Sequence, residues 1–491
     1  MDDPESSKIK WQPYSQASFD SARLGLKPLI MLISAKWCRE CRAYEGKTLE
    51  SEDISRNINK HLVPIYVDAD KRPDILEKYI SGGLPTTVLL DYNGNELVRL
   101  GGILNGSALM ALMEKAATEK VPKARVPAPE DEAKSGSGNA KEFLFDFESR
   151  LAMEFDELYG GFGQGEKFPN THALDYLAVR YAQNQKNFWK TIVERSLRGI
   201  LRLKDKAGGG YFRYASSRDW EGAHNEKMLC TNAEIADAML KSGKVLENGE
   251  FLKEGESALE WMLEELNDAK TGGFYGSRAA ASERYFETAI KDRKAIGNPE
   301  TDTTKYCAWN AQAAIAFLHG HRLLNKLRYW EVADRALGFM ASRMLTENGM
   351  HHYFNETEGG RLDGLLLDNA WAAVAFFEAY RIGKQEEHKG AGVKLLEYMI
   401  SRLYSKEKGA FMERNSKSAG MFRDFENKSS RLAYRGNAVA CWALALGYNA
   451  TQRGQYLNTA KDVAGKFIHV HDDLDATALM AQVALNIMGN D

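Results

Sequence analysis

Two cysteines, Cys38 and Cys41, are separated by two residues and follow an apolar run that predicts a buried strand. The residues after them predict a helix, so Cys38 would lie at the helix N-terminus. Unpaired N–H groups carry a partial positive charge there and favour a thiolate over a thiol. Arg39 should strengthen this effect and Glu40 should weaken it. Cys41 lies one turn further along, where it can resolve a mixed disulfide, so the pair predicts thiol–disulfide chemistry.

Two other interpretations of this pair stay open. A zinc site needs two further ligands, and this part of the chain offers no second close pair of cysteines or histidines. Alternatively, the two cysteines are inert packing residues. The remaining cysteines, Cys230, Cys307 and Cys441, lie in apolar helical segments and are expected to be buried. We expect no bound metal and no cofactor.

A second group of polar residues lies at junctions between the helices predicted beyond residue 140. His224 and Glu226 stand near a helix start and form a candidate general acid/base pair, because imidazole titrates near neutrality and a carboxylate can orient it. Helix capping is the structural alternative, as it is for Asp302. Aromatic side chains with amides and carboxylates suit a small polar or sugar-like ligand. The residues expected to bind it are Lys167, Arg213, Asn232, Asp302, Trp309, Asn310, Asp368 and Asn437.

These ligand-binding residues come from distant parts of the sequence. A toroid of helical hairpins would bring alternate junctions to a common mouth, so we expect most of them, with His224 and Glu226, to converge on one cavity. For Trp309, packing in the core is the alternative.

The first part of the chain predicts a small α/β domain with a mixed sheet. Short apolar runs bounded by breakers indicate buried strands, and Asn93-Gly94 predicts a hairpin between two of them. The order of elements is β-α-β-α-β-β-α. The expected strands are 28–34, 62–67, 86–90 and 96–100, and the closing helix is 106–119. We assign residues 1–122 to this domain.

Residues 123–139 are rich in Pro, Gly, Ser and acidic side chains and predict a linker. After it the strand signals disappear. About twelve helix-length segments follow between residues 140 and 491, separated by Gly-Gly-aromatic motifs at 160–162, 209–212 and 272–275. This pattern predicts an (α/α)6 toroid with these loops on one rim, rather than a four-helix bundle or a solenoid.

Composition excludes several classes of partner. Net charge is −3, from 65 basic and 68 acidic residues, so nothing indicates nucleic acid or an anionic membrane. The first residues are polar and acidic, no segment is apolar enough to span a bilayer, and five cysteines are too few for a disulfide scaffold. We therefore expect a cytoplasmic protein.

The ordered motifs resemble a known family. Trp37-Cys38-x-x-Cys41, with Gly83-x-Pro85-Thr86 further on, resembles the thioredoxin superfamily, and Val67-Asp68-Ala69-Asp70 is similar to its spermatogenesis-associated protein 20 or YyaL-like branch. The resemblance implies a thioredoxin-like domain before an (α/α)6 barrel, with a cis Pro85 opposite Cys38. Motifs of the second domain resemble the same family in order; they are Tyr159–Pro169, Gly209–Asn232, Asp302, Trp309-Asn310, Asp368-Asn369 and Gly436-Asn437.

Two departures from the family pattern bear on function. Thioredoxins have a buried carboxylate six residues before the first cysteine, where this chain has Leu32, which favours thiol exchange or sensing over general disulfide reduction. An acidic stretch of the family is replaced by Arg278-Ala279-Ala280-Ala281, which disfavours a glycosidase with a paired acid and base there.

Three functions follow as hypotheses. The first is a thiol–disulfide redox protein, acting on a thiol- or disulfide-bearing partner, with a barrel that binds a sugar-like or other small polar ligand. The second is a carbohydrate-active isomerase or epimerase whose thioredoxin-like domain is regulatory. The third is a non-enzymatic redox-sensing module. The sequence leaves open whether the barrel is an enzyme.

Overall fold

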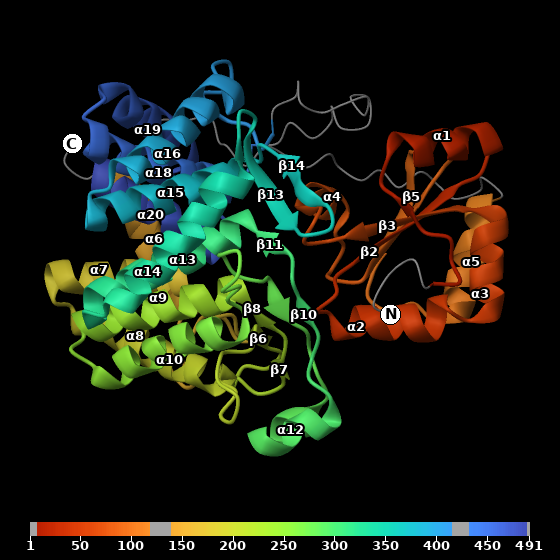
Figure 1. Cartoon of the computed structure of the whole chain (residues 1–491), viewed down its shortest axis with the longest axis horizontal. Helices are drawn as coiled ribbons and strands as arrows, with labels where there is room; N and C mark the ends of the chain where they lie inside the picture. The colour runs from red at the N-terminus through yellow and green to blue at the C-terminus, as the bar shows by residue number, and fades with distance from the viewer. Residues whose placement is uncertain (1–6, 118–138, 415–431, 489–491) are drawn as a thin grey trace. The chain divides into compact units, whose positions relative to one another are not determined.

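The computed structural model describes residues 7–117, 139–414 and 432–488 (Figure 1). These residues fall into two compact units, one on each side of residues 118–138. The boundary predicted at residue 122 and nearly all of the predicted linker, 123–139, lie outside the described residues. Asn139 is described and caps the first helix of the second unit, where its side chain accepts a hydrogen bond from the N–H of Lys141.

The first unit is built on a five-stranded mixed sheet with the order β1-β3-β2-β4-β5. The first three strands are parallel, and β4 and β5 continue the sheet in antiparallel fashion. Every residue of β2 and β4 is buried, which explains why both strands are continuous apolar runs in the sequence. The strands are β1 (Gln12–Pro13), β2 (Leu29–Ser34), β3 (Val63–Asp68), β4 (Thr86–Leu90) and β5 (Glu96–Gly101). The predicted thioredoxin-like sheet is confirmed.

Helices cover this sheet. α3 and α5 contact each other, and their apolar side chains pack on Ile30, Leu32 and Leu89 from the sheet (Figure 1). α2 follows β2 and continues as a π-helical turn, η2. The helices are α1 (Gln16–Gly25), α2 (Arg39–Tyr44), η2 (Glu45–Leu49), α3 (Glu52–His61), α4 (Pro73–Tyr79) and α5 (Gly106–Ala117).

The second unit is a ring of six inner helices. Each inner helix contacts the next, and the last contacts the first, so the ring is closed. The inner helices are α7 (Thr171–Asn184), α9 (Leu229–Val245), α13 (Cys307–Leu324), α15 (Leu366–Gly383), α18 (Tyr434–Thr451) and α20 (Leu474–Ile487). They are buried along most of their length, as helices at the centre of a large domain are.

Six outer helices surround this ring, each preceding an inner helix in the chain. They are α6 (Ala140–Glu154), α8 (Asn187–Ile200), α10 (Gly249–Glu265), α14 (Leu327–Phe339), α16 (Glu386–Tyr398) and α19 (Gly454–Phe467). Short 3-10 or π turns extend three of them: η3 (Leu201–Leu203), η4 (Met340–Met344) and η5 (Met399–Leu403). The predicted (α/α)6 toroid is confirmed.

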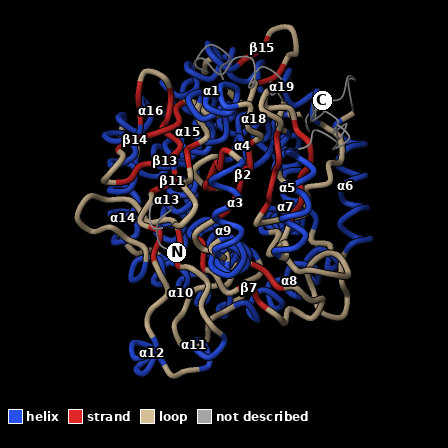
Figure 2. The backbone as a smooth tube through the Cα atoms, turned by 90° about the vertical axis from the view of Figure 1, so that its right-hand side faces the viewer, coloured by secondary structure: helices blue, strands red, loops and turns tan. Residues whose placement is uncertain are grey.

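Short strands join the outer to the inner helices, where the sequence shows no strand signal. Most have only two residues, too few for an alternating pattern to be visible. Figure 2 shows them among the loops. They are β6 (Tyr214–Ala215), β7 (Ala223–His224), β8 (Lys227–Met228), β9 (Ser277–Arg278), β10 (Thr301–Asp302), β11 (Lys305–Tyr306), β12 (Leu345–Thr346), β13 (Gly349–Asn355), β14 (Gly359–Asp363), β15 (Tyr404–Ser405) and β16 (Ala410–Phe411). Two short helices, α11 (Glu283–Glu287) and α12 (Ile290–Ile296), lie between β9 and β10.

Hydrogen bonds link these loops around one rim. Lys167 pairs with Ala215, β8 with β9, and β11 with β13, so each of the first three loops is bonded to the next. The N–H of Leu366 donates to the carbonyl of Glu413, and the ring closes where the N–H of His172 donates to Asp475. The Gly-Gly-aromatic loops therefore lie on one rim, as predicted.

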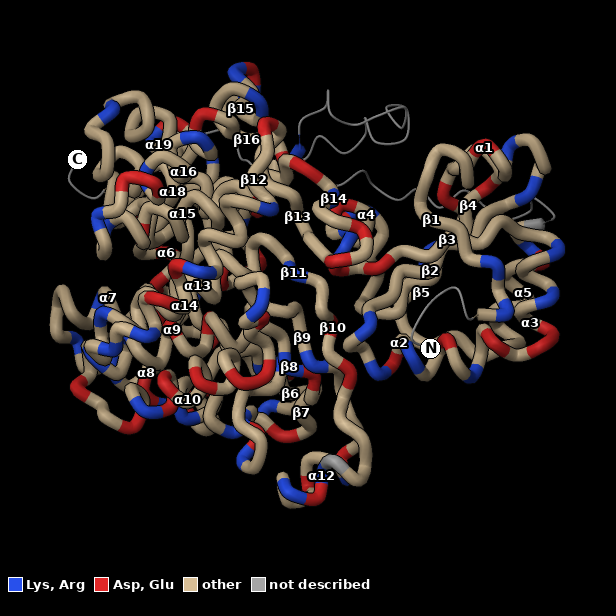
Figure 3. The backbone as a smooth tube through the Cα atoms, in the orientation of Figure 1, with Lys and Arg blue, Asp and Glu red and all other residues tan. Residues whose placement is uncertain are grey.

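Charges are interspersed over both units (Figure 3). Within the described ranges, no helix is both long and apolar enough to cross a membrane.

Candidate functional sites

The cysteine pair forms a disulfide at the start of α2. The two Cα atoms are 5.2 Å apart. Cys38 is the N-cap residue, and its Sγ accepts the N–H of Cys41 at 3.1 Å. Cys38 is 4% exposed and Cys41 is wholly buried, so the first cysteine is the more accessible. Nowhere in the described residues do three His, Cys, Asp or Glu side chains gather as metal ligands would.

The residues around the disulfide fix its position. Trp37 donates its indole N–H to Asp70 at 2.6 Å, which explains the acidic motif after β3. Arg39 forms an ion pair with Glu40 at 3.2 Å, so the acidic residue beside Cys38 is partly neutralised. Pro85 follows a cis peptide bond at the start of β4, as the family resemblance implied.

A buried polar group lies on the sheet face where thioredoxins carry an acid. Leu32 is buried, but Ser34, two residues further along β2, donates to the carboxylate of Glu45. Burial raises the pKa of Glu45, although its hydrogen bonds with Ser34 and Tyr66 act in the opposite direction. The sequence analysis missed Glu45, which no family motif marks.

Three lysines of the rim hold the loops through buried ion pairs. Nζ of Lys167 lies 2.9 Å from Asp156, and Lys227 and Lys305 repeat this contact in the next two loops at 2.8 and 2.7 Å. Burial opposes ionisation of Asp156, but hydrogen bonds from Arg218 and Lys167 hold its pKa well below the usual range. The Lys167 side chain is 0% exposed and also donates to the carbonyl of Gly163. It supports the loop and does not line an open cavity.

Three of the predicted ligand-binding asparagines also contact the rim loops. Asn232, Asn310 and Asn437 are wholly buried in the first turns of α9, α13 and α18. Each Oδ1 accepts a backbone N–H from the aromatic residue of a loop, at 2.7, 2.7 and 2.9 Å. Each Nδ2 donates to that residue's carbonyl and to a carbonyl four residues earlier in the chain. Their amides are thus saturated by backbone groups.

His224 and Glu226 have different neighbours. The His224 ring stacks on Tyr214 at 4.2 Å between centroids, and Tyr214 stacks on Phe168 at 4.6 Å. Glu226 lies 3.6 Å from the guanidinium of Arg213. The structure therefore places the candidate acid and base in one rim loop, each with a separate partner.

Three other predicted residues gather around Tyr306. Asp302 accepts the Tyr306 hydroxyl at 3.0 Å, and the Trp309 ring lies 4.3 Å from the Tyr306 ring. Asp368 contacts Nδ1 of His352 at 2.8 Å, and the ring of His352 is 5.9 Å from that of Tyr306. Asp302, Trp309 and the Asp368–His352 pair are thus brought together around Tyr306, whose carbonyl also accepts a hydrogen bond from Asn310.

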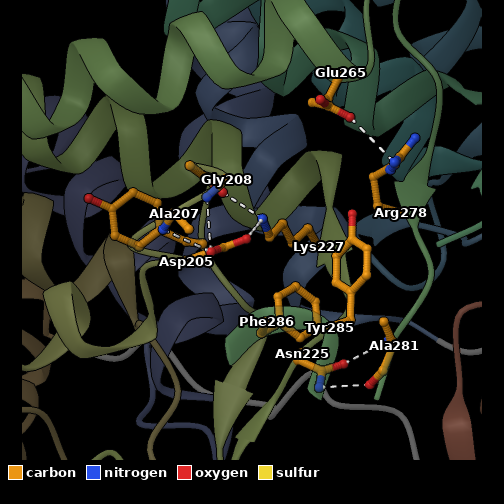
Figure 4. A network of polar contacts seen from close by, with 12 residues as sticks. Asp205, Ala207, Gly208, Asn225, Lys227, Glu265, Arg278, Ala281, Tyr285 and Phe286 are labelled. Carbon is orange, nitrogen blue, oxygen red and sulfur yellow. Dashed lines mark hydrogen bonds and ion pairs between the residues drawn. The ribbon is translucent and has the colours of Figure 1, made fainter. Parts of the chain in front are cut away.

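A pocket of about 290 Å³ opens in the rim between β8, β9 and the two short helices (Figure 4). Its apolar walls are Trp261, Tyr285 and Phe286. Lys227 and Arg278 supply positive charge, and Figure 4 shows their partners Asp205 and Glu265. The remaining lining residues are Gly208, Asn225, Ala279, Ile290, Arg293, Asn298 and Pro299.

Two positively charged residues of this pocket bind the carboxylate of Asp205. Lys227 and Arg293 both donate to its carboxylate, at 2.8 and 2.6 Å. Burial raises the pKa of Asp205, but hydrogen bonds from Arg293 and the charge of Lys227 outweigh it and hold that pKa well below the usual range. Burial lowers the pKa of Lys227. Asn225 fixes the opposite wall by bonding both backbone groups of Ala281 at 3.0 Å.

A second polar cluster lies inside the ring of inner helices. His172 and Glu234 are 3.5 Å apart and line a small cavity of about 20 Å³, with Trp371 and Trp442. A cavity of this size has room for one water molecule. Burial alone would lower the pKa of His172, but the interaction with Glu234 raises it.

The cluster continues deeper along α9 and α13. Lys241 contacts Asp175 at 2.9 Å and Asp237 at 2.6 Å, and Asp237 also contacts His319 at 2.6 Å. Burial opposes ionisation of Asp237, but the charges of Lys241 and His319 hold its pKa well below the usual range. The interior of the ring is therefore an ion-pair network rather than a purely apolar core.

Comparison with known proteins shows what each part of the chain is similar to. Residues 3–99 match the family model described as Thioredox_DsbH, a protein of unknown function, DUF255. Human spermatogenesis-associated protein 20 is 24% identical over 312 residues, which cover 56% of this chain and 39% of the human protein. More than half of the chain is thus similar to spermatogenesis-associated protein 20. It spans about two fifths of the length of the human relative in this match.

Two further proteins are similar to this chain, one in sequence and one in fold. Disulfide bond reductase DsbH from Chlamydia pneumoniae is 23% identical over 124 residues, 23% of this chain and 74% of that protein. Cellobiose 2-epimerase from Bacillus thermoamylovorans shares the barrel fold, with a TM-score of 0.53 and 12% identity over 66% of this chain and 86% of that structure. At this identity the likeness establishes the fold alone.

The sequence did not predict the rim pocket or the interior cluster. Arg278, in the segment that departs from the family's acidic stretch, lines the pocket. Its position after a Gly-Gly-aromatic loop was the available signal. His172, Glu234 and Asp237 lie within buried helices, where no motif distinguishes them from helix-surface polar residues.

Proposed function

We propose that the Cys38–Cys41 pair carries out thiol–disulfide exchange with a thiol- or disulfide-bearing partner. The hydrogen bond from the Cys41 N–H to Cys38 Sγ supports this proposal, because such a donor stabilises a thiolate at a helix N-terminus. The similarity of this part of the chain to a bacterial disulfide bond reductase supports it too.

Cysteine variants test this proposal. Oxidised glutathione added to reduced Cys41→Ser protein should leave glutathione attached to Cys38, because no second thiol can release it. Cys38→Ser should form far less adduct, since Cys41 is buried. Mass spectrometry of the intact protein distinguishes the two. Adducts that form equally on both variants, or on neither, contradict the proposal.

A second candidate function belongs to the barrel, which would bind a sugar-like or other small polar ligand in the rim pocket. The pocket combines a volume near that of small-molecule sites with three aromatic walls and charged groups. Sugar rings stack on such walls while hydroxyls pair with charged and amide groups. The fold shared with a cellobiose 2-epimerase makes cellobiose a reasonable first probe.

Calorimetric titration with cellobiose tests the rim pocket. Tyr285→Ala should weaken binding at least tenfold by removing one stacking wall, whereas Phe188→Ala, an exposed aromatic on α8, should leave it unchanged. Product analysis after incubation would reveal epimerisation and support the isomerase alternative. Equal affinity of the Tyr285 variant and the wild type would contradict ligand binding in the rim pocket. Affinity that depends on the Cys38–Cys41 redox state would favour the sensing module.

A further inference from the structure

In the thioredoxin-like unit, the carboxylate of Glu45 lies close to β2, which has Leu32 where thioredoxins have an acid. Side chains alternate along a strand, so Ser34 faces the same side of β2 as Leu32. The Ser34 hydroxyl donates to Glu45, which reaches this face from the helical side. Glu45, a residue outside the strand, thus places a carboxylate beside this face of β2.

Glu45 is also one helical turn from Cys41. Its backbone N–H donates to the carbonyl of Cys41, so the α-helical spacing is kept at this point although η2 begins here. Residues four apart in a helix share a face, with Cβ atoms about 5–6 Å apart. Cys41 is wholly buried, whereas Glu45 is only half-buried and can exchange protons with water.

The groups facing Glu45 set its proton affinity. Burial raises its pKa, and hydrogen bonds with Ser34 and Tyr66 and the charge of Arg42 partly oppose this shift. Asp68 on β3 adds negative charge beside Tyr66, whose pKa is raised by burial, Glu45 and Asp68. A carboxyl group whose pKa is raised toward neutrality is better suited to exchange protons with a thiol than an ordinary one.

We propose that Glu45 accepts the proton of the Cys41 thiol when Cys41 resolves a mixed disulfide on Cys38. This inference rests on the proposed redox function. The Cys41 S–H bond breaks and its proton moves to the Glu45 carboxylate. The Cys41 thiolate then attacks Cys38 Sγ, the Cys38–Cys41 bond forms, and the partner leaves as a thiolate that takes up one proton. Glu45 finally returns its proton to water. In the reverse direction Glu45 protonates the released Cys41 thiolate.

A two-phase thiol assay tests Glu45. The assay uses full-length protein with Cys230→Ser as the wild-type background, because the thiol of Cys230 is only half-buried and would also react. The reduced protein is mixed with 5,5′-dithiobis(2-nitrobenzoate), which first forms a mixed disulfide at Cys38 and releases one thiolate. Attack by Cys41 then releases the second. The rate of the second phase in Glu45→Gln should fall about 100-fold or more, because a positioned general base typically contributes about 100- to 10,000-fold. The first phase should be unchanged.

The pH profile separates proton exchange from a structural effect. The second-phase rate of the wild type should rise through an inflection at the raised pKa of Glu45, and Glu45→Gln should lack this inflection. Ser34→Ala removes a hydrogen bond that lowers the pKa of Glu45, so the inflection should move to higher pH. Glu52→Gln, an exposed acid on α3 paired with Arg56, is the matched control and should behave as the wild type.

The two proposals fail in different ways. Wild-type protein that never releases a second thiolate contradicts the redox function itself. Wild-type protein that releases both, with Glu45→Gln identical at every pH, overturns only the role of Glu45. If Glu45→Gln does not fold, the Ser34→Ala variant decides. An inflection at the same pH as in the wild type would then contradict the role of Glu45.

Discussion

Buried ion pairs between lysine and aspartate recur at the same place in three successive rim loops. Each aspartate begins a Gly-Gly-aromatic turn, and each lysine lies shortly before or at the start of the following inner helix. A buried pair of this kind adds little net stability, because desolvation offsets the attraction, but loss of one partner leaves a buried charge unpaired. The repeated pairs therefore hold a defined loop geometry, on which the rim pocket depends.

The buried asparagines also hold the rim loops in place, with neutral amide groups instead of charged side chains. Asn310→Ala should lower the free energy of unfolding by about 2–4 kcal/mol, because it leaves both backbone groups of Phe274 without their partner in a buried position. Asn187→Ala, at an exposed position on α8, should change it by less than about 0.5 kcal/mol. Urea denaturation followed by circular dichroism measures both values. Similar effects of the two substitutions would contradict the structural role of Asn310.

Asp475, which accepts the backbone N–H groups of His172 and Ala173, predicts a pH dependence of the free energy of unfolding. Burial raises the pKa of Asp475 to about 6, against its ordinary 3.8, although His172 and Arg435 act in the opposite direction. A raised carboxyl pKa means that the folded protein holds this proton more tightly than the unfolded chain does. The stabilisation is complete below pH 4 and is lost as the pH rises to 6, by about 3 kcal/mol at most.

Comparison with Asp475→Asn isolates this contribution. The free energy of unfolding of the wild type, relative to the variant, should fall between pH 4 and pH 6 and then level off. Asp472→Asn removes an exposed acid of the preceding loop and should show no such trend. A wild-type stability that stays level relative to Asp475→Asn over this range would show that the pKa of the carboxyl is ordinary, and one that rises would show that it is lowered.

At the scale of elements, glycine allows the rim loops to approach the outer helices. Gly210 has a φ of +67°, and a Cβ added there would lie 2.4 Å from the Trp261 ring. Gly273 repeats the arrangement, with a φ of +75° and an added Cβ that would lie 3.0 Å from the ring of Phe339 on α14. Two consecutive glycines thus satisfy both the backbone conformation and the space available.

Replacing Gly210 with alanine should therefore destabilise the barrel by about 2–4 kcal/mol, from backbone strain and the displaced indole ring. Gly465→Ala is the matched control, because Gly465 lies within α19 with no atom within 4 Å of the added Cβ. The Gly465→Ala protein should be more stable than the wild type by up to about 1 kcal/mol, because alanine favours a helix interior over glycine. Thermal unfolding of the two variants gives opposite signs if this account is correct.

The elements that the sequence predicted well are those whose signal is local and long. The buried strands β2 and β4 are apolar runs, and the twelve barrel helices are separated by recurrent glycine motifs. The two-residue strands of the rim escaped prediction because two residues are too few to show an alternating pattern. The partners of Lys167 and Asn310 were not predictable, since a lysine or an asparagine suits a ligand and a buried loop equally well.

At the scale of the whole molecule, each unit has its own hydrophobic core. One core joins residues of the sheet, α3 and α5, and the other joins the helices of the toroid. The disulfide closes a short loop in the first unit alone. In the chain-entropy account, a cross-link stabilises by restricting the unfolded segment that it closes, here by about 2 kcal/mol.

Reduction of Cys38–Cys41 should consequently weaken the first unit and leave the barrel unaffected. Hydrogen exchange of the full-length protein, read by mass spectrometry, reports each segment separately. Peptides from β2 and β3 should exchange faster after dithiothreitol treatment, by up to about 30-fold if they open globally with their unit, while peptides from α13 and α15 should be unchanged. Protein with Cys38→Ala and Cys41→Ala, treated in the same way, corrects for effects of the reductant. Faster exchange in α13 or α15 on reduction would instead demonstrate energetic coupling between the redox pair and the barrel.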